Sequence, residues 1–233
     1  MPYIVFNNVT REYRAGKEKI KALANANFSV EKDSFTIILG PSGSGKSTTL
    51  NLLGGMDRAT SGQIFVGDKE ITALSDKQLT DYRRTDVGFV FQFYNLIPNL
   101  NAYENVDVSA RLGKNPLDPK KMLSAVGLEK RMKNFPSEMS GGEMQRTSIA
   151  RALCKNPDLI LCDEPTGALD SATGRTILQL LQNIAHNEGK TVVVVTHNSA
   201  IAPAADRVIR LKDGHVVQVT DNKNPVSMEE VTW

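Results

Sequence analysis

A glycine-rich loop between a predicted strand and a predicted helix limits the possible folds of this chain more than any other feature. The β-rich run at residues 35–39 precedes the loop, and residues 48–53 continue it as a helix. Glycine lets a backbone curl its N–H groups around an anion, and the helix adds the positive end of its dipole. The loop matches the pattern G-x-x-x-x-G-K-S/T with the residues Gly40, Pro41, Ser42, Gly43, Ser44, Gly45, Lys46 and Ser47. We therefore expect a phosphate-binding turn at the carboxyl end of a buried strand.

Two side chains of this loop have chemistry that a simple glycine turn would not need. Lys46 is expected to reach the β- and γ-phosphates of a nucleotide, and the hydroxyl of Ser47 to ligate Mg²⁺. Thr48, the next residue, is predicted to belong to the same binding loop. A chance glycine turn is the alternative, and the strand before and the helix after the loop argue against it.

An apolar run at residues 159–162 ends in the carboxylates Asp163 and Glu164. Such a continuous run is typical of a parallel strand that is covered on both faces. At its carboxyl end, Asp163 is expected to hold Mg²⁺, while Glu164 can act as the general base for an attacking water. Taken alone, the pair is as often a helix N-cap followed by a solvated carboxylate. The phosphate loop upstream favours the catalytic interpretation.

A second glycine-opened helix begins at Ser140, Gly141, Gly142 and Glu143. Ser140 and Glu143 fit a capping box, in which each side chain bonds the backbone N–H of the other residue. A helix terminus of this kind is also an anion site. Because the chain has the catalytic residues of only one complete site, we expect this terminus to serve a nucleotide bound by another copy.

Alternating strands and helices predict an α/β fold with a parallel-sheet core. Residues 191–195 form a second buried strand. The helix before them ends at Gly189 and has one apolar face, made by Ile177, Leu180, Leu181 and Ile184. We expect helices on both faces of this sheet, and ligands at the carboxyl ends of its strands.

The two ends of the chain predict additional strands. Apolar positions within residues 4–9 and 23–30 indicate a sheet of short strands, joined by a loop that contains Tyr13, Arg14 and Gly16. Residues 207–211 and 215–219 are expected to form a closing hairpin. The tail at 221–233, including Trp233, has no predicted role.

Residues 102–153 interrupt the strands with helical patterns, so a helical subdomain is predicted to be inserted into the core. The whole chain, residues 1–233, is then a single domain. Its nucleotide-binding α/β core and N-terminal antiparallel β subdomain comprise residues 1–93 and 155–220, and its helical subdomain comprises residues 94–154.

Composition excludes several classes of protein. Hydrophobic residues make up 40% of the 233, and a formal net charge of +2 is too small to indicate nucleic-acid binding. Cys154 and Cys162 lack the spacing of a metal site or a disulfide framework. Residues 1–8 do not resemble a signal peptide, and no apolar run approaches the about 20 residues of a membrane-spanning helix. We expect a cytoplasmic protein whose membrane contacts are made through a partner.

In these motifs and their order, the chain resembles the nucleotide-binding subunit of an ABC transporter, a P-loop NTPase with a RecA-like core. The similarity covers nearly the whole chain. In that family two cassettes sandwich two ATP molecules, and the phosphate loop of one faces the signature motif of the other. The resemblance implies ATP hydrolysis with Mg²⁺, a homodimer and a separate membrane permease as partner.

The resemblance also implies roles for single residues. Tyr13 would stack on adenine, although an aromatic residue in such a loop is as often a packing residue. Gln92 would sense Mg²⁺ and the attacking water. Ser140 and Gly142, with Gly141 between them, would contact the γ-phosphate of the partner's nucleotide.

Two further matches lie in the C-terminal half. Asp170 corresponds to the loop that couples the two sites across the dimer, and His197 to the switch histidine that contacts the γ-phosphate. His197 follows a buried strand, whereas His186 and His215 are interpreted as ordinary surface or packing residues.

The signature departs from the commonest family sequence at two positions. Met139 replaces a Leu, which conserves volume. Glu143 replaces a Gln, and although either completes a capping box, a carboxylate close to a triphosphate is expected to oppose ATP closure.

Three stretches, at residues 55–62, 88–98 and 163–170, resemble the macrolide and peptide exporters and lipoprotein-release systems. In these systems ATP-driven closure moves transmembrane helices by mechanotransmission. The resemblance implies efflux of drugs or peptides, a place on the inner face of the membrane, and a periplasmic or membrane-fusion-like accessory protein. The apolar run at 93–98 is either a permease-docking groove or internal packing.

Two other classes of function compete with this one. A soluble ABC ATPase of DNA repair or translation would have the same motifs without a permease, but its usual tandem cassettes, coiled coils or zinc modules do not occur in this sequence. A P-loop kinase for a small molecule is disfavoured by the signature helix and by His197.

Overall fold

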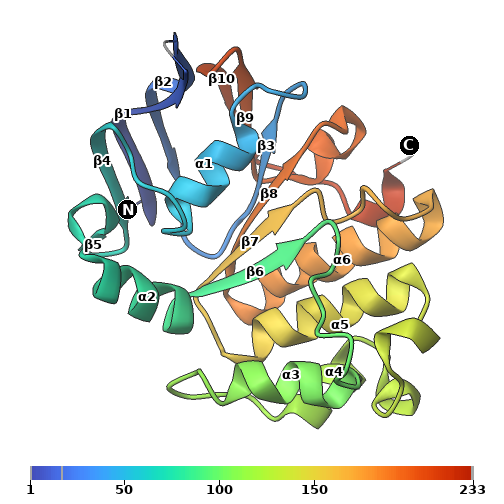
Figure 1. The fold of residues 1–233 in the computed structure, drawn as a ribbon. Coiled ribbons are helices and arrows are strands. Elements are labelled where there is room, and N and C mark those ends of the chain that lie inside the picture. The colour runs from blue at the N-terminus through green and yellow to red at the C-terminus, as the bar shows by residue number, and fades with distance from the viewer. Residues whose placement is uncertain (1, 17, 232–233) are drawn as a thin grey trace.

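Six strands form the central sheet of the computed structural model, which describes residues 2–16 and 18–231 (Figure 1). In spatial order they are β10 (His215–Asp221), β9 (Arg207–Lys212), β3 (Phe35–Leu39), β8 (Thr191–Thr196), β7 (Leu159–Asp163) and β6 (Val87–Phe91). The pairs from β9 to β6 are parallel, and β10 joins β9 as an antiparallel hairpin. The predicted parallel core and the closing hairpin are both confirmed.

The central strands are buried on both faces, which explains their continuous apolar runs. Ile38, Leu161 and Val193 point to one face, while their neighbours Ile37 and Val194 point to the other. Two long helices, α5 (Gly141–Cys154) and α6 (Ser171–Glu188), cover the second face. The first face is covered by α1 (Lys46–Leu53) together with a second sheet (Figure 1). Helices thus lie on both faces of the central sheet, as predicted.

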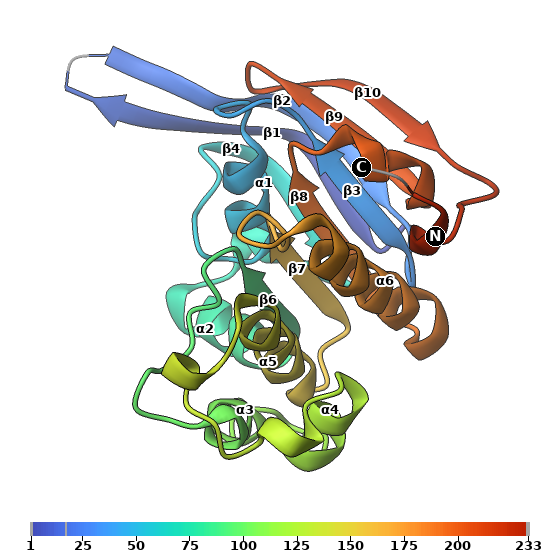
Figure 2. The same cartoon turned by 90° about the vertical axis from the view of Figure 1, so that its right-hand side faces the viewer.

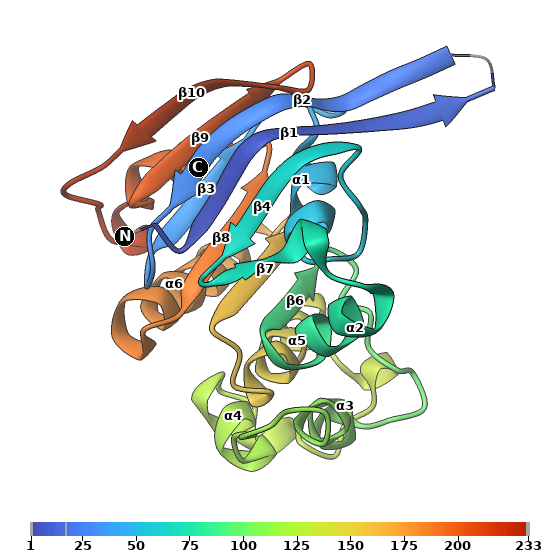
Figure 3. The same ribbon diagram turned by 90° about the vertical axis from the view of Figure 1, so that its left-hand side faces the viewer.

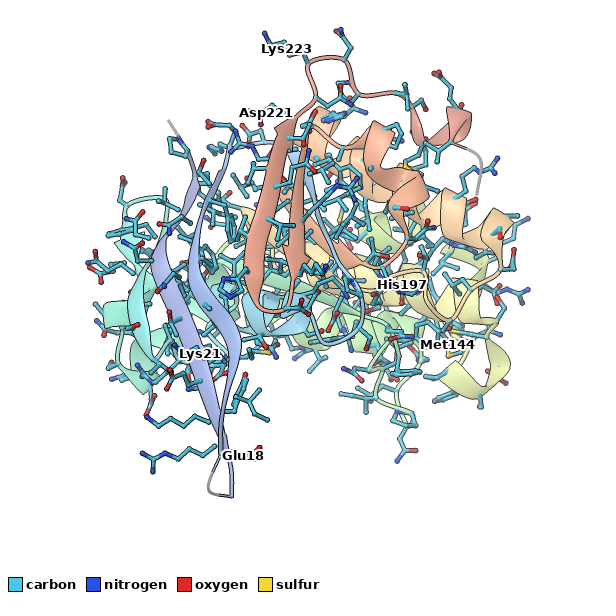
Figure 4. All side chains as sticks on the ribbon, turned by 90° about the horizontal axis from the view of Figure 1, so that it is seen from above. Glu18, Lys21, Met144, His197, Asp221 and Lys223 are labelled. Atoms are coloured by element: carbon cyan, nitrogen blue, oxygen red, sulfur yellow. The ribbon has the colours of Figure 1, made fainter. Side chains whose placement is uncertain are left out.

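The second sheet is antiparallel, and its order is β2 (Glu18–Val30), β1 (Ile4–Ala15), β4 (Ser61–Val66) and β5 (Lys69–Glu70). The hairpin of β1 and β2 projects well beyond the body of the molecule (Figures 2 and 3), and Glu18 lies on this projection in Figure 4. The prediction of short strands was therefore wrong. Tyr13 and Arg14 lie within β1, paired with Ile20 and Lys19, because backbone pairing continues where the apolar pattern has ended.

The helical subdomain packs around buried Leu123, Leu128 and Ile149. Its elements are α3 (Ala102–Ala110), α4 (Pro119–Ala125), the short turns η2 (Glu129–Arg131) and η3 (Pro136–Glu138), and α5. Helix α5 also contacts β6, so it joins this subdomain to the central sheet. Two further helical elements, η1 (Ile71–Ala73) and α2 (Asp76–Thr85), follow β5.

The C-terminal tail belongs to the core, although the sequence indicated no role for it. Turn η5 (Met228–Glu230) packs against α6, and Met228 is fully buried. Gln182 of α6 donates from Nε2 to the carbonyls of Ala204 and Val226, both at 2.9 Å. Its Oε1 accepts from the backbone N–H of Met228 at 3.1 Å. The tail also bonds to η4 (Ser199–Ala204), since the N–H of Val226 donates to the carbonyl of Pro203 at 3.1 Å. Trp233 lies outside the described residues.

Within residues 2–16 and 18–231, no helix combines the length and the apolar character that crossing a membrane requires.

Replacing Met228 by Ala should lower the free energy of unfolding by about 2–5 kcal/mol, because it leaves a cavity where a fully buried side chain was. Urea denaturation followed by circular dichroism measures this change. Glu230→Ala, at an exposed position of the same turn, is the matched control and should change stability by less than about 0.5 kcal/mol. Equal effects of the two substitutions would show that the tail is not part of the core.

Candidate functional site

The carboxyl ends of β3, β7 and β8 meet at a pocket of about 810 Å³. The phosphate loop forms one wall of this pocket, through Pro41, Ser42, Gly43, Gly45, Lys46, Ser47 and Thr48. Gln92, Asp163, Glu164 and His197 line the same pocket. The structure therefore brings together residues that the sequence spreads over more than half of its length. Ala22 of β2 also lines the pocket, and no sequence signal had indicated it.

The phosphate loop adopts a backbone that needs its glycines. Gly43 and Gly45 have φ angles of 76° and 100°, in the left-handed region that other residues rarely adopt. A Cβ atom on Gly45 would lie 2.4 Å from the carbonyl oxygen of Ala22, so the second sheet presses directly on the loop. Helix α1 begins at Lys46 without a side-chain cap, which leaves its first N–H groups free for an anion.

Two polar side chains of the loop fit a phosphate ligand. The ammonium group of Lys46 donates to the carbonyl oxygens of Gly40 at 2.8 Å and Pro41 at 2.9 Å, and its third donor is left for another acceptor. The hydroxyl of Ser44 is buried and has no hydrogen-bond partner among the residues that the structure describes. A phosphate bound in this loop would provide the hydrogen-bond acceptor that the buried hydroxyl of Ser44 lacks.

A hydroxyl and a single carboxylate fit a Mg²⁺ ion that takes its other ligands from phosphates and water. Ser47 Oγ donates to Asp163 Oδ1 at 3.4 Å, across the mouth of the loop. Burial raises the pKa of the Asp163 carboxyl, and the hydrogen bond from Ser47 partly opposes this shift. A cation at this position would favour the ionised carboxylate.

Glu164 is held in an unusual backbone conformation next to Asp163. Its φ angle is 46°, a left-handed value that costs free energy in a residue with a side chain. Its N–H donates to the carbonyl of Val195 at 3.0 Å, and its carbonyl accepts from Gly167 at 3.0 Å. Its carboxylate lies 3.0 Å from Nδ1 of His197. Glu164 and His197, the predicted general base and switch histidine, are thus in direct contact.

Gln145 is a residue that sequence reasoning missed. It is fully buried in α5 and donates from Nε2 to the carbonyl of Pro165 at 2.8 Å. Pro165 directly follows Glu164, so this bond links α5 to the backbone next to the predicted general base. The sequence contained one signal for this role: Gln145 lies on the same face of α5 as the apolar Ile149, Ala152 and Leu153, at i, i+4, i+7 and i+8.

Gln92 is the first residue after β6, and its amide faces the loop that follows Glu164. A Cβ atom on Gly167 would lie 2.8 Å from its Nε2. Beyond Phe93, Tyr94 and Asn95 have left-handed φ angles of 59° and 50°. The guanidinium of Arg151 in α5 donates to both of their carbonyl oxygens, which stabilises this bend.

The signature residues lie in a second pocket of about 350 Å³, which shares no residue with the first. It is lined by Ser140, Gly141, Gly142, Glu143, Arg146, Ala168, Leu169, Asp170 and Thr173. The predicted capping box is confirmed: Ser140 Oγ accepts from the Glu143 N–H at 3.3 Å, and Glu143 Oε2 accepts from the Ser140 N–H at 2.8 Å. Asp170 caps α6 by accepting from the N–H of Thr173 at 3.0 Å, and this bond lowers its pKa.

Tyr13 lines neither pocket. Its side chain contacts Arg11 of the same strand and Asp57, which lies between α1 and β4. Its hydroxyl donates to Asp57 Oδ2 at 2.6 Å, and the guanidinium of Arg11 lies 4.5 Å from its ring centroid. Stacking of Tyr13 on an adenine ring stays a prediction.

Comparisons with known proteins agree with this geometry. A sequence model described as ABC transporter matches residues 23–167. An ABC transporter ATP-binding protein of Methanocaldococcus jannaschii, MJ0796, is 47% identical over 225 residues, which cover 91% of this chain and 94% of the relative. Its dimeric structure in a post-hydrolysis state, bound to ADP and Pi, superposes with a TM-score of 0.86 at 42% identity and covers 95% of this chain and 99% of that one.

Other relatives are longer than this chain. An ABC transporter ATP-binding protein homolog of Mycoplasma pneumoniae is 43% identical over 99% of the chain, which spans 50% of that relative. The macrolide export ATP-binding/permease protein MacB of Mannheimia succiniciproducens is 43% identical over 97% of the chain, which spans 36% of MacB. The chain thus spans half or less of the length of these two relatives.

These relatives are all named as ABC transporter proteins, which favours a transporter subunit over the soluble repair or translation ATPase. The fold agrees with that of the M. jannaschii structure, and the residues matched by the family model, 23–167, include the phosphate loop and α5. The chain therefore belongs to the ABC transporter family, as an ATP-binding ATPase domain with the P-loop NTPase fold.

Proposed function

We propose that two copies of this chain sandwich ATP between them and that their closure powers a membrane permease. The observation that carries this proposal is the separation of the phosphate loop and the signature residues into two pockets of one chain. A second copy would supply the signature residues that the first pocket lacks. The dimeric state of the M. jannaschii relative supports this arrangement.

In the proposed site the phosphate loop binds the triphosphate. Backbone N–H groups from Ser42 to Ser47 and the ammonium of Lys46 would neutralise its charge. Ser47, Asp163 and Gln92 are the residues that would hold Mg²⁺, which when bound supplies charge neutralisation between the phosphates. Ser140, Gly142 and Asp170 would complete the site from the second copy.

Glu164 is the proposed general base. Its strained backbone and its contact with His197 hold the carboxylate toward the pocket, where it can orient a water and accept its proton. His197 would contact the γ-phosphate and so connect the position of Glu164 to the presence of ATP.

The similarity to MacB supports an export system that works by mechanotransmission, with drugs or peptides as the class of cargo. In this proposal the chain is bound to the cytoplasmic face of the membrane through its permease. An accessory protein on the far side of the membrane would complete the system. Cargo contacts would lie outside this chain.

The loop after Gln92 is the proposed docking surface for the permease. Phe93 is 74% exposed and Ile97 is 45% exposed, whereas internal packing would have buried both. Exposed apolar side chains of this kind, next to the predicted catalytic residue Gln92, can pack against a cytoplasmic helix of a membrane partner.

Lys46→Ala should weaken ATP binding by about a hundredfold or more, because it removes the cation that faces the β- and γ-phosphates. Equilibrium binding of a fluorescent ATP analogue measures the loss. Lys120→Ala, at an exposed position in the first turn of α4, should leave affinity unchanged. Normal affinity in the Lys46 variant would contradict the assigned site.

Glu164→Gln should retain ATP binding, reduce the hydrolysis rate by about 10²- to 10⁴-fold and accumulate an ATP-bound dimer, because the amide cannot accept the proton of water. Phosphate release and sedimentation velocity measure the two effects. Glu188→Gln, at the exposed end of α6, is the control. Hydrolysis at the parent rate would show that another residue is the base.

Substitution of Phe93 and Ile97 by Asp should abolish co-purification with the permease from detergent extracts, while ATP binding and the fold are kept. Ile20→Asp, which alters an exposed apolar residue on the projecting hairpin, should keep the complex intact. Retention of the permease by the Phe93/Ile97 variant would place the docking surface elsewhere, and loss of folding would indicate internal packing.

A further inference from the structure

The signature helix has a carboxylate where a triphosphate is expected to approach. Glu143 lies in the first turn of α5, and its side chain is only 16% exposed. In the proposed dimer, the same helix terminus faces the ATP bound by the other copy. A negative charge there would oppose the helix dipole that favours the anion. In the structure this negative charge is paired with the guanidinium of Arg131.

Both carboxylate oxygens of Glu143 are engaged. Oε2 accepts from the backbone N–H of Ser140 at 2.8 Å and from the Ser140 hydroxyl at 3.0 Å. Oε1 accepts from Nε of Arg131 at 2.8 Å. The Ser140 N–H, and to a lesser extent Arg131, hold the pKa of Glu143 below its usual value, so the group is ionised at neutral pH.

Arg131 is held in place by the helical subdomain. Its N–H donates to the carbonyl of the buried Leu128 at 2.9 Å, and its carbonyl accepts from Asn134 at 3.0 Å. The same segment is joined to the start of α3, where Tyr103 and Ala102 donate to the carbonyls of Met132 and Asn134, both at 2.9 Å. The guanidinium therefore reaches Glu143 from a fixed backbone.

The charges around the signature pocket show what Arg131 contributes. Glu143 and Asp170 are the carboxylates that line the pocket, and Arg146 is the guanidinium. These side chains alone leave one negative charge in excess. Arg131, which bonds to Glu143 from outside the lining, cancels this excess.

We propose that Arg131 is a positioning and charge-compensating residue of the signature site. It allows Glu143 to complete the capping box without making the helix terminus repel the partner's ATP. This inference rests on the proposed ATP-sandwiched dimer. It assigns a role to a residue that lies outside both pockets and that touches neither nucleotide.

The test uses the full chain with Glu164→Gln, so that ATP-dependent dimers accumulate. Sedimentation velocity at a series of ATP concentrations gives the midpoint of dimer formation. Arg131→Ala should raise this midpoint by about fivefold at low salt, because an uncompensated carboxylate then faces the triphosphate. The difference should shrink at about 0.5 M NaCl, where screening weakens the repulsion.

A second substitution separates charge from structure. Adding Glu143→Gln to Arg131→Ala should restore the midpoint to within about twofold of the parent, because a neutral Gln still completes the capping box. Arg131→Lys, which keeps the charge, should lose less than Arg131→Ala. Arg111→Ala is the matched control, since it removes an exposed arginine and its ion pair with Asp107 from the same subdomain. It should leave the midpoint unchanged.

The possible failures are distinguishable. If the Glu164→Gln protein with Arg131 intact forms no dimer with ATP, the proposed function fails and this inference falls with it. If the dimer forms but Arg131→Ala leaves its midpoint unchanged, only the inference is overturned. An equal loss in Arg131→Ala and in the double variant would also overturn it, since that result indicates a structural contact rather than compensation of charge.

Discussion

The parallel pairing of β3, β8 and β7 is the constraint on which the rest of the structure depends. Its register places Leu39 opposite Thr196 and Asp163 opposite Val195, so the strands end side by side. The phosphate loop, the acidic pair and His197 all begin where these strands end. Because each strand packs apolar side chains on both faces, a shift in register would disrupt the close packing on both sides of the sheet and is disfavoured. Burial of the sheet thus positions the residues predicted to be catalytic.

The second requirement is that the signature helix be held by the helical subdomain yet connected to the catalytic pocket. Two contacts connect α5 to the pocket: Gln145 bonds the backbone next to Glu164, and Arg151 holds the bend after Gln92. A third contact, between Glu143 and Arg131, joins the start of α5 to the helical subdomain. In the proposed dimer, a movement of the start of α5 at the partner's nucleotide would be transmitted along the helix to the residues predicted to be catalytic in this chain.

Much of the fold and the site was predictable, because its motifs are local. The phosphate loop needs glycines at positions with positive φ, the buried strands have continuous apolar runs, and Ser140 with Glu143 forms a capping box within four residues. Other features gave no local signal. The long hairpin was predicted as short strands with Tyr13 in a loop, because its outer half is held by backbone pairing and not by an apolar face. The tail was overlooked because Met228 is buried by Gln182 and α6, which are distant in sequence.

The sequence by itself therefore determined the family, the chemistry of the phosphate loop and the residues at the strand ends, since these depend on spacing along the chain. Only the tertiary structure decided which residues share a pocket and which do not. Ala22 joined the phosphate pocket because the second sheet packs against Gly45, and the signature residues were separated from it because they belong to another subdomain. The charge of Glu143 looked unfavourable in the sequence. Its compensation by Arg131, twelve residues earlier in the chain, depends on how the helical subdomain folds back on α5.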